Sequence, residues 1–509
     1  MHAADTVIHL LDKGAGQTPA ILAPGRVALG YDGLRGLATA TVESLNRLGI
    51  GCGDRVAMVL PNGPEMAAAF VAIACGATTA PLNAGYRTEE FDFYLADLNA
   101  RALVVAAGIE SPARAVAAAR GIPVIELMSD QTAAAGLFTL RAEPSMRGTA
   151  ARPGFAAADD VALVLHTSGT TSRPKIVPLS HANITASADH IAAALDLRAD
   201  DLCLNIMPLF HIHGLIGAVL SSLAAGAGVC CAPGFNALKF FAWLEEIRPS
   251  WYTAVPTMHQ AILARAPRNA AIIKAGRLRL IRSSSASLPP QVMTELEEVF
   301  VAPVIESYGM TEASHQMASN PLPPRAHYPG CVGVAAGPEI AIMDEDGTLV
   351  PAGKPGEIVI RGRNVTAGYE NNPEANVKAF TDGWFRTGDQ GVLDQDGYLR
   401  LTGRLKELIN RGGEKISPLE IDTVLMDHPA VAQVVTFGVP HPKLGEDVAA
   451  AIVLREGASA DERELRDFAA ARLAEFKVPR QIVFLEEIPK GATGKLQRIG
   501  LAERLGVTA

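Results

Sequence analysis

The densest set of anion-binding groups in the chain lies at residues 167–175, where a short apolar run ends in a polar loop. The loop carries several hydroxyls, a glycine and the cations Arg173 and Lys175. Hydroxyls and backbone N–H groups bind phosphate oxygens, glycine lets the backbone approach them, and the cations neutralise their charge. The segment therefore predicts a phosphate-binding loop, with a polar surface turn as the simpler alternative. It is not a Walker loop, because Pro174 precedes the lysine and Ile176 follows it.

Further segments carry groups that suit a nucleotide. The stretch Glu306–Glu312 offers an aromatic face at Tyr308 and a carboxylate at Glu312, and carboxylates suit Mg²⁺, which prefers hard oxygen ligands. Asp389 follows a glycine turn and suits ribose hydroxyls, and Arg404 adds a second ribose or phosphate contact. Taken singly, these residues have ordinary interpretations as a core tyrosine or solvated charges. Their combination predicts a nucleotide site.

A lysine near the C-terminus stands on a glycine-rich loop. The stretch Pro489–Lys495 contains Gly491 and Gly494, so Lys495 is carried on a segment that can bend. A lysine in such a loop is usually a solvated side chain. Its catalytic interpretation depends on the other motifs.

The elements that must position these groups follow an α/β rhythm. Short apolar runs alternate with longer helical patterns, with strands predicted at 55–60, 102–106, 161–165, 250–255, 278–282 and 301–306 and a helix at 64–74. This rhythm predicts mostly parallel sheets, whose crevices lie beyond the carboxyl ends of the strands.

The texture of the sequence changes twice towards the C-terminus. From about residue 337 to 401, short alternating strands with Asp–Gly turns predict an antiparallel β subdomain. After Gly403 come compact strands and helices, one of them at 417–428 with Ser417 as its N-cap. We therefore predict an α/β protein with a large N-terminal domain of stacked, mostly parallel sheets plus a β subdomain (1–402) and a small α+β C-terminal domain (403–509).

Composition excludes several classes of function. The chain has 509 residues and a net charge of −9, without a basic stripe interleaved with aromatics, so nucleic acid is not an expected partner. Six cysteines without CxxC spacing predict buried free thiols in a reducing cytoplasm. The stretch Gly214–Ala232 is the most membrane-like, but its small residues favour a buried element beside a pocket over a membrane span. The N-terminus shows no secretory signal pattern. The expected location is the cytoplasm.

In this order the motifs resemble the acyl-adenylate-forming superfamily, which includes acyl-CoA synthetases, firefly luciferase and the adenylation domains of peptide synthetases. The resemblance runs from about residue 20 to about residue 500. Within the superfamily the chain looks most similar to oxalate–CoA ligases, through the segments 167–175, 208–214, 282–288, 310–315 and 410–418. The resemblance implies a ligase that uses ATP, Mg²⁺ and coenzyme A, forming first an acyl-AMP and then an acyl-CoA thioester.

The resemblance also assigns roles to residues. Thr311 would bind the α-phosphate, Glu312 would hold Mg²⁺, and Lys495 would stabilise the charge that develops between carboxylate and phosphate. Lys406 matches the hinge of a mobile C-terminal domain, whose Gly412, Gly413 and Glu414 would line the CoA tunnel after the domain swings. The implied ATP and AMP site comprises Thr167, Ser168, Gly169, Thr170, Thr171, Ser172, Lys175, Ser285, Ala286, Ser287, Glu306, Ser307, Tyr308, Gly309, Asp389 and Arg404.

The acid-binding pocket implied by the resemblance is polar. Its residues are His211, His213, Ser283, Ser285 and His315. Histidines and hydroxyls suit the second carboxylate of a very short acid such as oxalate, whereas a fatty acyl chain favours apolar walls. Malonate ligases carry an arginine shortly after their Val-Pro-Thr motif, and this chain has Met258-His259-Gln260 there. The alternative for His213 or His315 is a core histidine that bonds to backbone.

One position departs from the family pattern, and other functions stay open. Most relatives have glycine where Ile176 stands; if that position requires positive φ, isoleucine would be strained and ATP binding weakened. The alternatives are a CoA ligase for a short- or medium-chain monocarboxylic acid, an adenylation enzyme that loads a carrier protein, and a non-catalytic nucleotide-binding relative. The oligomeric state does not follow from the sequence.

Overall fold

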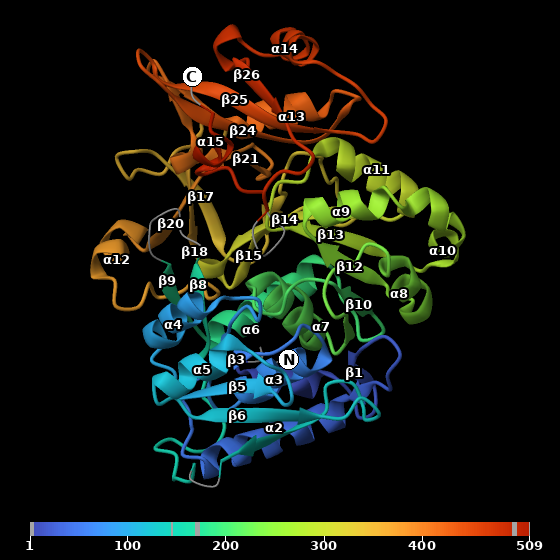
Figure 1. The fold of residues 1–509 in the computed structure, drawn as a ribbon, viewed down its shortest axis with the longest axis vertical. Coiled ribbons are helices and arrows are strands. Elements are labelled where there is room, and N and C mark those ends of the chain that lie inside the picture. The colour runs from blue at the N-terminus through green and yellow to red at the C-terminus, as the bar shows by residue number, and fades with distance from the viewer. Residues whose placement is uncertain (1–4, 144–145, 168–173, 491–495, 508–509) are drawn as a thin grey trace.

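The computed structural model describes residues 5–143, 146–167, 174–490 and 496–507 (Figure 1). Within these ranges the chain forms four β-sheets. In Figure 1 two large, mostly parallel sheets with their helices form the lower and right-hand parts of the molecule, and an antiparallel sheet lies at the left. The fourth sheet lies at the top, with the C-terminal segments. The predicted α/β class with parallel sheets and an antiparallel β region is confirmed.

The first large sheet carries most of the predicted site residues. Its nine strands run in the order β16-β15-β14-β13-β12-β10-β11-β1-β2. The central pairs from β14 to β1 are parallel, and β2, β15 and β16 are added antiparallel at the edges. The strands are β1 (Pro19–Leu22), β2 (Leu29–Gly30), β10 (Leu202–Asn205), β11 (Gly228–Cys231), β12 (Trp251–Ala254), β13 (Leu280–Ser284), β14 (Val304–Met310), β15 (His315–Ser319) and β16 (Val334–Ala335).

The second large sheet leads into the phosphate loop. Its order is β7-β6-β5-β3-β4-β8-β9, parallel except for the edge strands β7 and β9. The strands are β3 (Arg55–Val59), β4 (Thr78–Pro81), β5 (Ala102–Ala106), β6 (Val124–Ser129), β7 (Phe138–Ala142), β8 (Val161–Thr167) and β9 (Lys175–Ser180). The strands predicted at 55–60, 102–106 and 161–165 are therefore confirmed within one or two residues.

Two smaller sheets complete the described chain. The third sheet, antiparallel, contains β17 (Glu339–Met343), β18 (Gly356–Arg361), β19 (Phe380–Thr381), β20 (Trp384–Leu393) and β21 (Leu399–Arg404). The fourth contains β22 (Ile409–Arg411), β23 (Glu414–Ile416), β24 (Val431–His441), β25 (Gly445–Leu454) and β26 (Gln481–Phe484). The chain passes from one to the other through the single 3₁₀ turn η5 (Leu405–Glu407), which contains the predicted hinge Lys406.

Helices cover the sheets and fill the space between them. Helix α3, predicted from its alanine-rich sequence, has ten of its eleven residues buried and belongs to a core that also includes strand residues of both large sheets. The helices are α1 (Val7–Leu10), η1 (Leu11–Lys13), α2 (Tyr31–Arg47), α3 (Pro64–Ala74), α4 (Thr88–Asp97), α5 (Pro112–Ala119), α6 (His181–Ala194), η2 (His213–Leu220), α7 (Ser221–Ala224), α8 (Phe240–Ile247), α9 (Pro256–Leu263), η3 (Ala266–Asn269), α10 (Ala270–Ala275), α11 (Pro290–Phe300), η4 (Thr311–Ala313), α12 (Pro373–Ala379), α13 (Pro418–Met426), α14 (Glu462–Ala470), η6 (Glu475–Lys477) and α15 (Leu501–Leu505).

The predicted helix at 417–428 forms as α13, but Ser417 does not cap it as expected. Ser417 occupies the N-cap position without a side-chain capping bond, and its hydroxyl donates instead to the backbone oxygen of Thr402 on β21. A neighbouring strand end thus competes successfully for the hydroxyl. The same bond ties the fourth sheet's first helix to the end of the third sheet.

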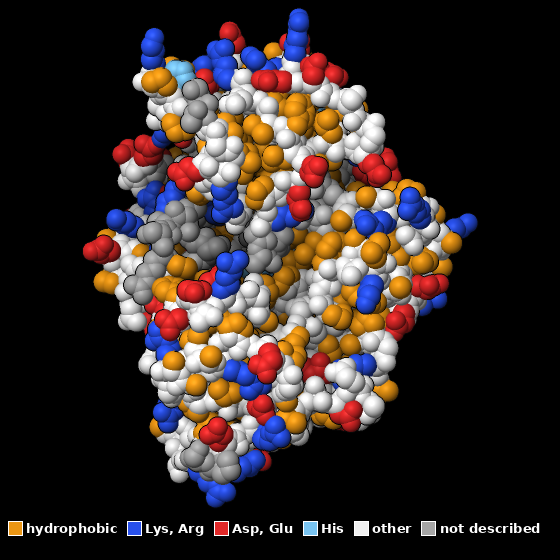
Figure 2. All heavy atoms as spheres, viewed as in Figure 1, with side chains coloured by type: hydrophobic (Ala, Val, Ile, Leu, Met, Phe, Trp, Pro, Cys, Tyr) orange, Lys and Arg blue, Asp and Glu red, His pale blue; other side chains and the backbone are white. Residues whose placement is uncertain are grey.

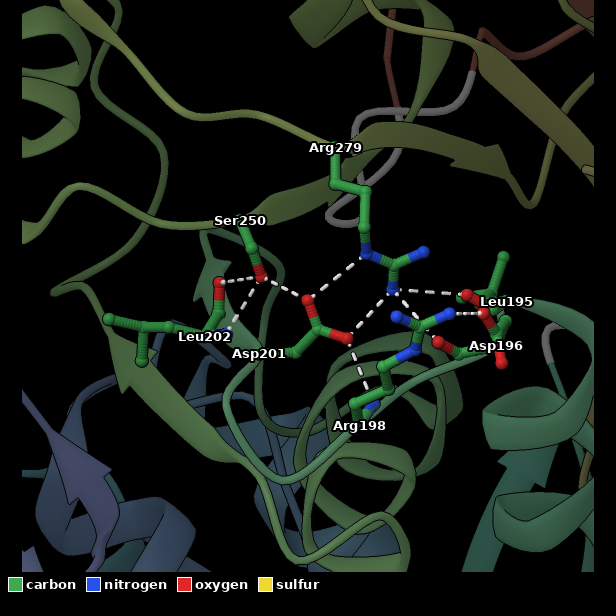
Figure 3. A network of polar contacts seen from close by, with 7 residues as sticks. All are labelled: Leu195, Asp196, Arg198, Asp201, Leu202, Ser250 and Arg279. Atoms are coloured by element: carbon green, nitrogen blue, oxygen red, sulfur yellow. Dashed lines mark hydrogen bonds and ion pairs between the residues drawn. The ribbon is translucent and has the colours of Figure 1, made fainter.

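A polar network fastens the amino-terminal edge of the first sheet (Figure 3). Asp201, just before β10, accepts hydrogen bonds from Arg279 at 2.7 Å and from the Ser250 hydroxyl at 2.6 Å. Ser250 and Arg279 directly precede β12 and β13, so one carboxylate aligns the starts of three neighbouring strands. Burial alone would raise the pKa of Asp201, but the bonds from Arg279 and Ser250 hold that pKa below its ordinary value. The opposite, carboxyl edge of these strands carries the predicted acid pocket.

The membrane-like stretch from Gly214 to Ala232 is interior structure. It forms most of the π-helix η2, then α7 and β11, all of them buried. In the described ranges, no helix has both the length and the apolar character that a membrane crossing requires. All six cysteines are buried free thiols, as predicted.

Candidate active site

The predicted phosphate loop connects the antiparallel strands β8 and β9. Thr167 pairs with Lys175 at the ends of these strands, so the structure places both ends of the loop. The predicted loop residues Ser168, Gly169, Thr170, Thr171 and Ser172 lie outside the described residues.

The strain expected at Ile176 is wrong. Ile176 lies within β9 opposite His166, and it is not among the residues with positive φ. Its side chain is buried in a core that includes Val59 and Val164, and its carbonyl oxygen accepts a hydrogen bond from Glu370 N–H at 3.1 Å. Extended strand backbone suits a β-branched residue, so glycine is not required here.

Glu312, Tyr369 and Lys175 converge beside this loop. The buried Glu312 accepts a hydrogen bond from the Tyr369 hydroxyl at 2.8 Å, and the Lys175 Nζ lies 4.2 Å from the centre of the Tyr369 ring. Burial raises the pKa of Glu312 and lowers that of Lys175; the positive charge of Lys406 lowers the pKa of Lys175 further. Lys406, the predicted hinge, is therefore electrostatically coupled to Lys175 at the end of the predicted phosphate loop.

These groups fit a magnesium ion that is bound together with nucleotide phosphates. Among the described residues no group of three or more Asp, Glu, His or Cys side chains is placed to hold a metal alone. Mg²⁺ is commonly held by one or two carboxylates and the phosphates of its nucleotide, a set that Glu312 can complete. The second carboxylate oxygen of Glu312 is not engaged by Tyr369 and can serve as the ligand.

Tyr308, Asp389 and Arg404 form a second cluster. The Tyr308 hydroxyl donates to Asp389 Oδ2 at 2.6 Å, and Arg404 Nε donates to Asp389 Oδ1 at 2.9 Å. Asp389 and Arg404 are paired neighbours on β20 and β21, and Gly388 supplies positive φ (73°) just before the aspartate. The negative charge of Asp389 raises the pKa of Arg404. Each oxygen of Asp389 keeps a lone pair, so this carboxylate can also accept bonds from ribose hydroxyls.

Glycine at position 309 is required by close packing. Gly309 lies on β14 beside a bulge, and a Cβ atom there would approach the backbone oxygen of His315 on β15 to 1.6 Å. Any side chain at this position would force β15 away. Gly309 thus allows His315 to lie close to the Tyr308 segment.

Glu306 supports the loop that contains the predicted nucleotide-site residues Ser285, Ala286 and Ser287. Its buried Oε1 accepts the Leu288 N–H at 2.8 Å, which fixes the end of this loop. Burial raises the pKa of Glu306 to about 8. The backbone oxygen of Ser307 accepts a bond from the Ser284 hydroxyl at 3.0 Å, which ties β14 to β13 at the same edge.

His213 and His315, two of the three histidines predicted for the acid pocket, lie side by side, and both are buried. The rings of His213 and His315 stack with their centres 5.0 Å apart. His213 Nδ1 lies 3.1 Å from the Ser285 hydroxyl and its Nε2 lies 2.6 Å from the Thr253 hydroxyl. His211 Nδ1 accepts the backbone N–H of His213 at 3.2 Å, so it supports the turn that enters η2. Ser285 adopts a positive φ of 75° at this junction.

The sequence analysis missed Arg282 and misplaced Ser283. Arg282 is fully buried, and its Nη1 lies 3.1 Å from His315 Nε2. Side chains alternate along a strand, so Ser283 points to the opposite face from Arg282, towards α9 and α11. A signal was present: Arg282 ends a predicted buried strand, where a charged side chain is rare unless it has a partner.

The residues predicted to move lie in the upper part of the molecule. Gly412 and Gly413, with φ of 62° and 95°, form the exposed turn between β22 and β23, and Glu414 begins β23. The adjacent Lys415 pairs with Glu345, which follows β17 of the third sheet, at 2.8 Å. Lys495 lies outside the described residues.

The upper and lower parts of the molecule also touch directly. Gln260 on α9 donates to the backbone oxygen of Ala432 at 3.0 Å, and Gln291 on α11 bonds with Asp427. In Figure 2 the surface is hollowed between these two parts. Gln260 and Gln291 thus tie the upper and lower parts together through side-chain hydrogen bonds.

A cavity outside this cluster carries no comparable set of groups. It has a volume of about 890 Å³ and is lined by the ion-paired Arg26 and Glu65, by Lys239 and by mostly apolar neighbours. Its described lining includes none of the predicted site residues. The titratable cluster at the sheet edge, rather than this cavity, is the candidate active site.

Comparison with known proteins agrees with this geometry. The family model "AMP-binding enzyme" matches residues 12–370, and "AMP-binding enzyme C-terminal domain" matches residues 420–495. The chain is 46% identical to "Probable CoA ligase CCL9" of Humulus lupulus, over 98% of this chain and 96% of the relative. It is 45% identical to the oxalate–CoA ligase of Arabidopsis thaliana, over 97% and 98%.

A solved structure supports the fold and the conformation. The ATP-bound crystal structure of MatB from Rhodopseudomonas palustris has a TM-score of 0.88 at 30% identity and covers 98% of both chains. The apo structure of the same protein, with the same identity and coverage, has a TM-score of 0.78. Both MatB structures have the same identity to this chain, so the difference in TM-score reflects conformation. The described structure is therefore more similar to the ATP-bound form than to the apo form. The chain belongs to the AMP-binding enzyme family.

Proposed function

We propose that this chain is an ATP-dependent oxalate–CoA ligase. The observation that carries the proposal is the polar, buried end of the acid pocket, where His213 and His315 stack beside Ser285 and in front of the buried Arg282. A pocket with two imidazoles, hydroxyls and a cation favours a second carboxylate over an alkyl chain. The relative from Arabidopsis thaliana that carries the name oxalate–CoA ligase supports the same acid.

The first half-reaction activates the carboxylate. A carboxylate oxygen attacks the α-phosphorus of ATP, the bond to the β-phosphate oxygen breaks, and pyrophosphate leaves. Thr311 binds the α-phosphate, Asp389 and Arg404 hold the ribose, and Lys495 stabilises the negative charge between carboxylate and phosphorus. Mg²⁺ held at Glu312 neutralises phosphate charge when it is bound.

The second half-reaction makes the thioester. The thiolate of CoA attacks the carbonyl carbon of the acyl-AMP, the bond to the phosphate oxygen breaks, and AMP leaves. Residues 403–509 act as a mobile domain on residues 1–402, turning about Lys406. This turn withdraws Lys495 and brings Gly412, Gly413 and Glu414 to the tunnel for CoA. We place the activity in the cytoplasm, where the six free thiols stay reduced.

A pyrophosphate-release assay over a panel of acids tests the proposal. The panel contains oxalate, malonate, acetate, butyrate and octanoate, each with and without CoA. We expect oxalate to give the highest kcat/KM and oxalyl-CoA to appear in the mass spectrum only when CoA is present. Turnover of butyrate without turnover of oxalate would refute the choice of acid. Acyl transfer to a carrier protein but not to CoA would refute the ligase.

A further inference from the structure

A buried cation without a carboxylate partner lies directly behind the acid pocket. The Arg282 side chain is fully buried on β13, and within the described residues its hydrogen-bond partners are neutral groups: His315 Nε2 at 3.1 Å and Gln316 Oε1 at 3.2 Å. Its Nε has no hydrogen-bond partner in the structure. A buried charge that lacks an opposite charge destabilises the fold, so such a group calls for a role.

The contact with Arg282 fixes the protonation of His315. A guanidinium has donors only, so His315 Nε2 must be the acceptor in this contact. An imidazole whose Nε2 accepts a hydrogen bond is neutral and carries its proton on Nδ1. His315 is therefore not the cation that binds an acid; the positive charge lies one side chain further back, on Arg282.

The surroundings hold Arg282 in place. The amide of Gln316 donates to the backbone oxygen of Ala336 at 3.2 Å, which turns its oxygen towards Arg282. On η2, a Cβ atom at Gly217 would lie 2.7 Å from the His315 ring and 3.0 Å from Arg282 Nη1, so glycine leaves the room that this pair needs. A π-helix, the form that η2 takes, often marks a functional site.

Within the described part of the chain, the other titratable groups that we identify around this pair carry no permanent negative charge. They are Cys203 on β10, His213 on η2 and His190 on α6, with Thr253 on β12 and Ser187 on α6 as neutral neighbours. Burial raises the pKa of the Cys203 thiol well above its ordinary value, which keeps it neutral. Burial also lowers the pKa of Arg282 to about 9, so the guanidinium stays charged at neutral pH.

We infer that Arg282 is the positioning residue that selects a dianionic acid, acting through His315. Its charge balances the second carboxylate of the substrate, and its hydrogen bond holds His315 as the neutral tautomer that donates through Nδ1. The inference rests on the proposed oxalate–CoA ligase activity, and it identifies the residue that makes the enzyme prefer an acid with two carboxylates. A monocarboxylate would leave the buried cation without a counter-charge and so bind poorly.

Two substitutions remove the charge of Arg282, and a third variant is the control. Arg282→Met removes the charge and every donor, whereas Arg282→Gln removes the charge but keeps an amide where Arg282 has its Nε. The matched control is Arg279→Gln. Arg279 directly precedes β13, at the end of the strand opposite the acid pocket, and this variant breaks its ion pair with Asp201. Melting temperature by circular dichroism accompanies each kinetic measurement, so that loss of folding is seen directly.

The readouts are KM and kcat for oxalate, KM for ATP, kcat/KM for acetate, and their dependence on pH from 6 to 8. For both Arg282 variants we expect the KM for oxalate to rise about 10- to 100-fold, the range for losing a charged partner. The KM for ATP should stay within about twofold, and the ratio of acetate to oxalate turnover should rise. In both Arg282 variants, oxalate binding should strengthen as pH falls from 8 to 6, because His315 Nε2 no longer accepts the guanidinium bond and can take up a proton.

The outcomes distinguish the inference from the proposed function. A folded Arg282→Gln or Arg282→Met protein with the wild-type KM for oxalate would overturn the role of Arg282 and leave the ligase in place. Arg279→Gln should lower the melting temperature without changing the acetate-to-oxalate ratio; an equal change of ratio in this control would reduce the effect to general destabilisation and overturn the inference. A wild-type protein that releases no pyrophosphate with oxalate would overturn the proposed function itself.

Discussion

Replacement of Glu306 by glutamine should make the protein more stable at alkaline pH. The Glu306 carboxyl group is buried, with Oε2 unbonded and Oε1 accepting the Leu288 N–H. Burial raises its pKa from 4.5 to about 8. Glutamine has nearly the same shape and keeps an oxygen for Leu288, but it cannot ionise.

The size and sign of the effect follow from proton binding. Between pH 4.5 and 8 the folded protein keeps the Glu306 proton that the unfolded chain has lost, so stability decreases as pH rises through this window. One pKa unit corresponds to 1.36 kcal/mol, so the wild type should lose up to about 4 kcal/mol at pH 8 relative to pH 4.5. The Glu306→Gln variant should not show this loss of unfolding free energy, because glutamine does not ionise.

Scanning calorimetry of both proteins at half-unit steps from pH 5 to 8 measures the difference. At pH 5 the two melting temperatures should lie close together, and by pH 8 the variant should melt several degrees higher. The control is Glu297→Gln, whose carboxylate lies near the surface and pairs with His327. Parallel loss of melting temperature in wild type and Glu306→Gln across this range would show that Glu306 does not ionise with a raised pKa, and the reasoning would fail.

Three further perturbations test the site. Lys495→Ala should lower the rate of acyl-AMP formation about 10²–10³-fold while thioester formation from supplied acyl-AMP continues, and equal loss in both half-reactions would contradict the assignment. Gly309→Ala should destabilise the protein by about 3 kcal/mol or more in a thermal melt, because its Cβ would lie 1.6 Å from a backbone oxygen. Gly36→Ala, in open space on α2, should change the melting temperature little. Tyr369→Phe removes the donor to Glu312 but keeps the ring beneath Lys175, so the KM for ATP should rise about 2- to 10-fold in magnesium titrations; an unchanged KM would place Glu312 outside the magnesium site.

Local sequence patterns predicted the elements of this fold well. The buried strands at β3, β5 and β8 and the alanine-rich α3 are specified by their own apolar runs, so periodicity alone finds them. Ser417 was predicted as the N-cap by the same local reasoning and occupies that position, but its hydroxyl bonds to Thr402, on a strand that the local pattern does not show. Local sequence preferences predict the position of a cap, but a neighbour in the folded structure determines which hydrogen bond its side chain makes.

For the candidate site, local motifs located individual residues, but they did not show which residues are in contact. The resemblance located Tyr308 and Asp389, but the 2.6 Å bond between them joins positions 81 residues apart. Ile176 was judged by the glycine that relatives carry, whereas its strand pairing makes positive φ unnecessary. Arg282 was not singled out from the sequence, because its partner His315 lies on a strand that begins more than thirty residues later.

The Asp201 network in Figure 3 has a consequence for how this fold can change over generations. It fastens the strands at one edge, with Ser250 and Arg279 bonded to a single carboxylate, while the side chains that we propose for the acid pocket lie at the other edge. Stability and substrate choice are thereby encoded at opposite ends of the same strands. Mutations at the carboxyl edge can exchange one acid for another without loosening the sheet, because the alignment of β10, β12 and β13 does not depend on them. A lineage built on this sheet can therefore explore new acids by a few substitutions while its scaffold stays constant.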